Sequence, residues 1–145
     1  MTKISPPWPS AGTAYTVPLT DPGTCCAFVR DFIVVGCLNS DSYTVRWNAI
    51  GDPTDWPIPG TDDASTKQAG QQTFPVQFGI VTGIAGNDFF MYVFQERAIS
   101  KAVYTGGDTV WSFDVFEEDR GCLRTGKLTQ IDDKVFFESD RGFHV

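Results

Sequence analysis

The chain has 145 residues, of which 41% are hydrophobic and 14% aromatic, so it has enough apolar content for one globular domain with a core. Its 18 acidic and 11 basic residues give a formal net charge of −7, which argues against a surface that neutralises nucleic-acid phosphates. The amino terminus lacks an apolar signal segment, and the longest apolar run, residues 32–38, is too short to span a bilayer. We therefore expect a soluble protein, made in a cytoplasm, that has no membrane partner.

The first 24 residues are rich in proline. Five of the nine prolines in the chain lie there, at positions 6, 7, 9, 18 and 22. Proline cannot donate a backbone hydrogen bond and breaks helices, so this segment cannot form a central strand or a regular helix. We expect residues 1–24 to be an extended arm and residues 25–145 to be a β domain.

From residue 25 onward, short runs of β-branched and aromatic residues alternate with glycine, aspartate and asparagine, a pattern typical of strands joined by turns. Residues 32–35 and 89–94 are apolar on both faces, so we expect these strands to lie between neighbouring sheets. Residues 110–116 alternate instead and should bury one face only. No segment has a sustained helical period. We predict strands at residues 25–30, 32–38, 43–48, 76–85, 89–95, 98–104, 110–116, 127–131, 134–138 and 143–145.

A repeat of 44 residues gives the architecture. Residues 88–100 return as residues 132–144, and each copy reads as a polar turn, an apolar strand, a turn with an acidic residue and an arginine, and the start of a second strand. A period near 44 is typical of four-stranded propeller blades. The predicted strands amount to about two and a half blades, whereas a closed propeller needs about four. We therefore predict an all-β fold of antiparallel, blade-like sheets that form a partial β-propeller. Its open edges would be covered by further chain of a parent protein, by a neighbouring subunit or by the proline-rich arm.

Two features of the turns and loops have alternative interpretations. The long irregular stretch at residues 49–73 is either an insertion that lies over a blade edge with Trp56 as its apolar anchor, or a contact loop for another subunit. Arg97 and Arg141 hold equivalent places in the repeat. Each either fixes its hairpin by pairing with a nearby carboxylate or turn carbonyl, or lines a ligand groove.

The residues offer little for catalysis. The adjacent Glu117, Glu118 and Asp119 point in different directions along a strand or turn, which does not suit a pair of glycosidase carboxylates. The single histidine is His144, and the sequence has no nucleophile elbow, phosphate loop or dinucleotide fingerprint. We expect no enzymatic activity and no cofactor.

Metal binding is not expected either. Four loop aspartates lack the spacing of a calcium loop, and we expect them to be solvated: Asp52, Asp55, Asp62 and Asp63. Four cysteines lack zinc-ribbon spacing and should be reduced, mostly in the core: Cys25, Cys26, Cys37 and Cys122.

Five motifs follow one another in a recognisable order, at residues 45–56, 80–84, 94–99, 120–122 and 135–143. In this order, residues 25–145 resemble a stretch of the phage virion proteins that form tail nozzles, hubs or packaged-DNA stabilisers in short-tailed phages. The resemblance implies propeller-like blades and a ring, typically sixfold, that contacts portal, adaptor or other tail proteins. It implies a place in the virion, at the tail or head-to-tail junction, after synthesis in the host bacterial cytoplasm.

The interface candidates come from the contact loop and the blade hairpins: Trp47, Asp52, Pro53, Asp55, Trp56, Arg97, Arg141 and Phe143. We expect a structural virion component that acts through subunit assembly. An acidic wall would repel passing phage DNA and leave it mobile, without specific binding. The alternative is a carbohydrate-recognising phage adhesin module that uses aromatic faces such as Trp56. A glycan-cleaving enzyme is the third and weakest hypothesis.

Overall fold

A computed structural model describes residues 22–107 and 109–145. Within these residues, eleven strands form three antiparallel sheets, which confirms the predicted all-β fold of antiparallel sheets. The predicted arm at residues 1–24 falls almost wholly outside the described residues. Its last two positions, Gly23 and Thr24, belong to the first strand.

The first sheet contains four strands in chain order, each antiparallel to its neighbour. Its second strand is buried along its whole length because both of its faces are covered. Phe32 and Val34 pack into the main core, whereas Ile33, Val35 and Leu38 form a smaller cluster on the other face. The prediction of a strand between neighbouring sheets holds for one face only, because Trp56 of the loop, and not a second sheet, packs on the other face. The strands are β1 (Gly23–Val29), β2 (Phe32–Leu38), β3 (Thr44–Trp47) and β4 (Gly70–Thr73).

The second sheet repeats this plan, and the third is shorter. The second sheet follows the order β5 (Val81–Gly86), β6 (Phe90–Gln95), β7 (Ala98–Tyr104) and β8 (Trp111–Glu118). In the third sheet, β10 (Lys134–Ser139) lies between β9 (Leu128–Ile131) and β11 (Gly142–His144). The third sheet thus has three strands where the others have four.

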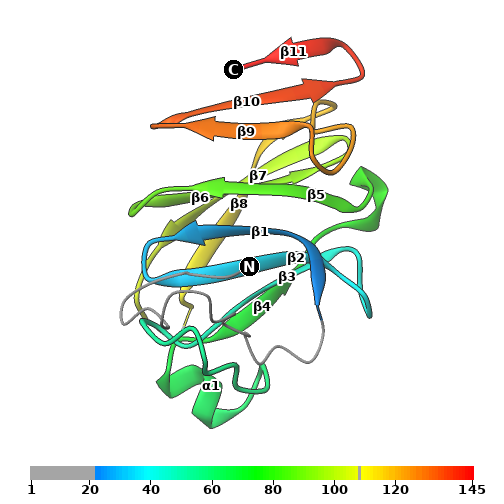
Figure 1. The fold of residues 1–145 in the computed structure, drawn as a ribbon. Helices are drawn as coiled ribbons and strands as arrows, with labels where there is room; N and C mark the ends of the chain where they lie inside the picture. The colour runs from blue at the N-terminus through cyan, green and yellow to red at the C-terminus, as the bar shows by residue number, and fades with distance from the viewer. Residues whose placement is uncertain (1–21, 108) are drawn as a thin grey trace, which may run out of the picture.

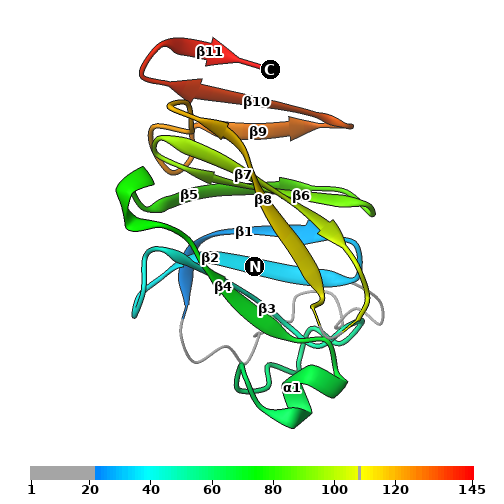
Figure 2. The same cartoon turned by 180° about the vertical axis from the view of Figure 1, so that it is seen from behind.

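The sheets follow one another along the molecule, with β5 next to β1 on one side and next to β9 on the other (Figures 1 and 2). The main core fills the space between the first and second sheets, and a second cluster, centred on Phe94, Ile99 and Phe137, joins the second sheet to the third. A side chain links the inner strands: Gln130 Oε1 accepts from the Gly86 amide at 3.0 Å, and Gln130 Nε2 donates to the Gly86 carbonyl at 2.9 Å. The described residues form no closed ring.

The 44-residue repeat corresponds to a repeated hairpin. Residues 88–100 cover the turn before β6, all of β6 and the start of β7, and residues 132–144 cover the turn before β10, then β10 and β11. Both copies therefore supply the second and third strands of a meander. The 44-residue period is therefore the number of residues from a strand of the second sheet to the equivalent strand of the third.

The structure differs from the prediction between residues 49 and 80. The stretch predicted as a loop contains the helix α1 (Asp62–Thr66), whose amino terminus is capped by the Thr61 hydroxyl, and the edge strand β4. The helix is too short to show a period, and β4 is polar and mostly exposed, so neither leaves an apolar pattern. The strand predicted at residues 76–85 begins only at Val81, because the 3₁₀ turn η1 (Val76–Phe78) follows Pro75.

Candidate interaction surfaces

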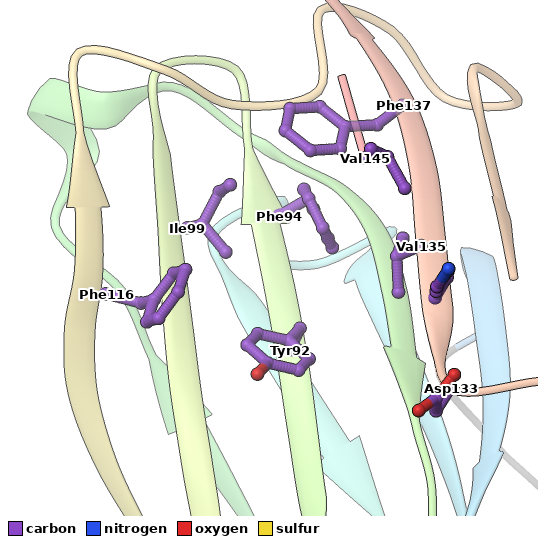
Figure 3. A pocket seen from close by; sticks show the side chains of 9 residues that line it. Tyr92, Phe94, Ile99, Phe116, Asp133, Val135, Phe137 and Val145 are labelled. Atoms are coloured by element: carbon purple, nitrogen blue, oxygen red, sulfur yellow. The ribbon is translucent and has the colours of Figure 1, made fainter.

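An apolar groove lies between the second and third sheets. It has a volume of about 260 Å³, with strands β6 to β8 on one side and β10 with the end of the chain on the other (Figure 3). We call this the apolar groove throughout. Its lining residues are Tyr92, Phe94, Ile99, Phe116, Asp133, Lys134, Val135, Phe137 and Val145.

The groove is closed at its base and open at its outer side. At the base, the buried rings of Phe94 and Phe137 lie 5.0 Å apart between centroids. Near the mouth, Phe116 meets Tyr92 edge to face at 5.6 Å, yet Phe116 remains 59% exposed. Phe116 is exposed because β8 is the fourth strand of its sheet, whereas the neighbouring third sheet has three strands among the described residues.

A bulge brings Phe116 to this position. On β7, Ile99 pairs with Glu117 and the next residue, Ser100, pairs with Val115, so Phe116 is the extra residue of β8. The bulge shifts the side-chain alternation that holds over the first part of the strand. The prediction for residues 110–116 assigned a buried face to Val115, which is 49% exposed. The adjacent apolar pair Val115 and Phe116 was the only sequence signal of the shift.

The outer edge of the third sheet lies beside the groove. β11 pairs only with β10, and it is held there by a 2.7 Å contact between Ser139 Oγ and His144 Nε2. The His144 ring also stacks on Phe137 at 5.1 Å. Phe143 is 86% exposed, and the backbone on the far side of β11 has no strand partner among the described residues.

The loop around Trp56 covers the first sheet. Trp56 packs on the small apolar cluster of β2, and its indole nitrogen donates to the Pro53 carbonyl at 2.9 Å. Arg46 Nη2 donates to the carbonyls of Trp56 and Pro57 at 3.2 and 3.0 Å. These contacts match the interpretation of an insertion anchored by Trp56. They leave a partner role for its exposed residues open.

The loop carboxylates bind groups within the loop. Lys67 Nζ lies 2.7 Å from Asp55 and 3.1 Å from Asp63, and both hydrogen bonds raise the pKa of Lys67. Asp52 accepts from the Thr54 hydroxyl at 2.6 Å and from the Thr54 amide at 3.0 Å, which lowers the pKa of Asp52. Across the part of the chain that the structure describes, no cluster of histidine, cysteine or acidic residues could hold a metal ion.

The two repeated arginines make different contacts. Arg97 Nη2 donates to the Gln77 carbonyl at 2.6 Å, and the Arg97 amide donates to the Phe78 carbonyl at 2.9 Å. This contact ties the β6–β7 hairpin to the turn η1, as the hairpin-fixing interpretation expected. In the second copy, the Arg141 amide donates to Ser139 Oγ at 3.0 Å, and its side chain is exposed.

The eight predicted interface residues do not form one site. Asp52, Pro53, Asp55 and Trp56 share the loop beside α1, whereas Arg141 and Phe143 lie at the opposite end of the molecule (Figure 1). Arg97 lies between them, at the β6–β7 turn. Trp47 is only 5% exposed, because it packs in the main core and donates its indole hydrogen to the Gln68 carbonyl at 3.0 Å, so a neighbouring subunit cannot reach its ring.

The groove offers little acid–base chemistry. Besides Tyr92, its titratable lining residues are Asp133 and Lys134, which differ in charge and do not form a carboxylate pair. Glu117, Glu118 and Asp119 lie at the end of β8 and do not line it. The groove is therefore suited to bury apolar side chains.

Comparison with protein-family models and with curated proteins found no match to this chain. Within residues 22–107 and 109–145, no helix has the length and apolar content needed to cross a membrane.

Proposed function

We propose that this protein is a structural component of a phage virion, in the tail or at the head-to-tail junction, that acts by assembling with itself and with neighbouring virion proteins. The observation that carries the proposal is the exposed apolar surface of the third sheet and of the groove beside it. Among the described residues β11 pairs only with β10, and the groove leaves Phe116 59% exposed. Unpaired strand edges beside aromatic side chains favour aggregation unless a partner covers them.

The exposed apolar residues of the third sheet support an assembly role. Ile131 is 58% exposed, Phe136 41%, Phe143 86% and Val145 76%. Three of these side chains lie on one small sheet and the fourth directly follows it, which exceeds the scattered single residues normal on a monomer's surface. A protein that works through subunit contacts needs such a surface.

The net negative charge of the chain supports a position close to DNA without tight binding to it. A formal net charge of −7 would repel phosphates over about 8 Å at physiological ionic strength. A conduit or retention ring must let its cargo move. We propose that any contact with DNA is transient and non-specific, that the partners include portal, adaptor or other tail proteins, and that the protein has no catalytic role.

Purification of the full chain tests the proposal. We expect light scattering after size exclusion to give a mass of several subunits, and antibody labelling of phage particles to mark the tail or the junction. A stable monomer that is absent from particles, or that binds no virion protein, would contradict the proposal.

The adhesin alternative makes a different prediction. It requires aromatic faces that are free to stack on sugars, whereas Trp56 packs on β2 and its indole nitrogen is occupied. Glycan binding by a monomer, lost in Trp56→Ala, would favour the adhesin.

A further inference from the structure

One face of the second sheet is covered by the third sheet only in part. The opposite face packs in the main core through residues such as Met91, Val93 and Ala102. Side chains alternate along a strand, so the intervening residues of β6, β7 and β8 point away from that core. Phe94 and Ile99 of this set are buried against the third sheet, and the rest form what we call the open face. Six residues make up most of the open face: Phe90, Tyr92, Lys101, Val103, Asp114 and Phe116.

The open face carries two charges of opposite sign that do not pair with each other. Lys101 on β7 and Asp114 on β8 are direct cross-strand partners. Lys101 Nζ nevertheless lies over the rings of β6, 4.3 Å from the Phe90 centroid and 5.9 Å from the Tyr92 centroid. Among the described residues, neither Lys101 nor Asp114 forms a salt bridge. The positive charge therefore lies on the β6 side of β7 and the negative charge on the β8 side.

We propose that the open face binds the open face of a second copy of the chain, about a twofold axis that runs along β7. The inference rests on the proposed assembly function and names one contact through which copies join. Rotation about this axis exchanges the β6 side with the β8 side and keeps each residue at its level along the strands. The Asp114 carboxylate of each copy then lies over the Lys101 ammonium of the other, so the ion pair forms twice, as in any twofold contact.

The same rotation brings apolar groups together. Phe116, which is 59% exposed, lies on β8 at the level of Ile99 on β7 and Phe94 on β6. Phe94 and Ile99 line the apolar groove, whose volume is about 260 Å³. Rotation therefore brings Phe116 of each copy to the mouth of the other copy's groove, while Val103, 46% exposed, lies close to the axis. Aromatic side chains that enter a pocket of the partner often dominate the binding energy of an interface.

The charges favour a second copy over other occupants. An apolar partner would leave both Lys101 and Asp114 without a partner in a contact that excludes water, which is costly. A nucleic acid would meet the Asp114 carboxylate beside Lys101 and a chain of formal net charge −7. A second copy supplies an anion for the cation, a cation for the anion and an aromatic ring for the groove. Such complementary charges also fix the register of a contact.

The third sheet leaves this face accessible. β9 packs on β5, which lies at the opposite edge of the second sheet from β8. Figure 3 shows Tyr92 and Phe116 on the open face, with Val135 of β10 on the side of the groove away from Phe116. A second copy over β6 to β8 would therefore lie beside the third sheet. The contact joins copies in pairs and leaves other surfaces, such as the loop around Trp56, for further partners.

Exchange of the two charges tests the contact in full-length chains. One chain carries Lys101→Glu, which leaves two negative charges on its open face, and another carries Asp114→Lys, which leaves two positive charges. A third chain carries both substitutions. The matched control is Asp140→Lys, which changes the net charge as much as Asp114→Lys but lies at an exposed turn of the third sheet. Circular dichroism checks that each chain keeps its strands.

We expect each single variant to halve the mass measured by light scattering and to raise the dissociation constant at least about tenfold in sedimentation equilibrium, because like charges then meet twice. An equimolar mixture of the two single variants, and the double variant alone, should recover the wild-type mass. Asp140→Lys should not change it. Phe116→Ala should raise the dissociation constant about tenfold because it removes the ring that enters the groove.

Three results would contradict the contact. Single variants that both keep the wild-type mass would overturn the inference and leave the proposed function standing, since copies would then assemble through another surface. A mixture and a double variant that stay dissociated, with their strands intact, would overturn it as well, because the loss would not arise from the two charges. A wild-type chain that is monomeric throughout would refute this contact and the proposed function together.

Discussion

Gly121 should be among the least replaceable residues of the chain. It lies in the connection from β8 to β9 and packs against the hairpin between β6 and β7. A Cβ atom at Gly121 would overlap the carbonyl oxygen of Gln95 and approach the Ala98 amide nitrogen to 2.8 Å. Both are backbone atoms, which cannot rotate away.

The backbone around Gly121 cannot easily move away from an added Cβ atom. The buried Gln95 side chain donates to the carbonyls of Pro75 and Gly79 at 3.0 and 2.8 Å, which fixes the end of β6. The next residue, Cys122, is fully buried, and its carbonyl accepts from the Thr82 hydroxyl at 2.8 Å. We therefore expect Gly121→Ala to lower the free energy of unfolding by about 3 kcal/mol, the upper end for overpacking, and the melting temperature by about 10 °C.

Urea denaturation followed by tryptophan fluorescence measures this loss. The control is Gly107→Ala, since a Cβ at Gly107 meets nothing within 4 Å and should change stability by less than about 0.5 kcal/mol. If Gly121→Ala unfolds at the same urea concentration as Gly107→Ala, the close packing between the connection and the hairpin is refuted.

Three further predictions concern the first sheet and its loop. Trp56→Ala should lower the free energy of unfolding by about 3 kcal/mol, measured by thermal or urea unfolding, because it uncovers β2. The control Ile58→Ala, at a position 74% exposed, should be nearly neutral. Equal effects of the two substitutions would contradict the anchoring role of Trp56. Burial raises the pKa of Cys25 to about 12, so only about one Cys25 thiol in 10,000 is ionised at pH 8. Ellman's reagent at this pH should therefore label the exposed Cys26 first. Faster labelling of Cys25 would count against its burial. The hydrogen bonds from Thr54 lower the pKa of Asp52, so their contribution to stability should be complete above the ordinary pKa of 3.8 and be lost as the pH falls through the lowered pKa. The stability difference between wild type and Asp52→Asn should therefore shrink in acid. A difference that stays constant with pH would exclude this contribution.

Much of the fold follows from apolar patterns that the sequence displays directly. The predicted strands at residues 32–38 and 98–104 coincide with β2 and β7, because their apolar runs are bounded by turns. The 44-residue repeat predicts the equivalence of the β6–β7 and β10–β11 hairpins. β4 was not predicted because its sequence, Gly-Gln-Gln-Thr, is polar and mostly exposed, and its backbone ladder with β3 leaves no mark in hydrophobicity.

The candidate surfaces were harder to predict. The repeat points to Phe143 but not to Phe116, since the exposure of Phe116 depends on a bulge and on the third sheet having only three strands among the described residues. Trp47 was chosen for its residue type and is instead a core residue. Sequence patterns indicate which residues are apolar, whereas the order of strands decides which of them remain uncovered.

The meander order of the sheets has a consequence for how the protein forms. Nearly every strand pairs with its neighbour in the chain, and the pairing of β3 with β4 closes the longest loop within a sheet. Local pairing keeps the loop-closure entropy low, so each sheet can form soon after its last strand leaves the ribosome. Of the three described sheets, the third is synthesised after the other two and has the fewest strand pairs, so we expect local pairing alone to stabilise it least.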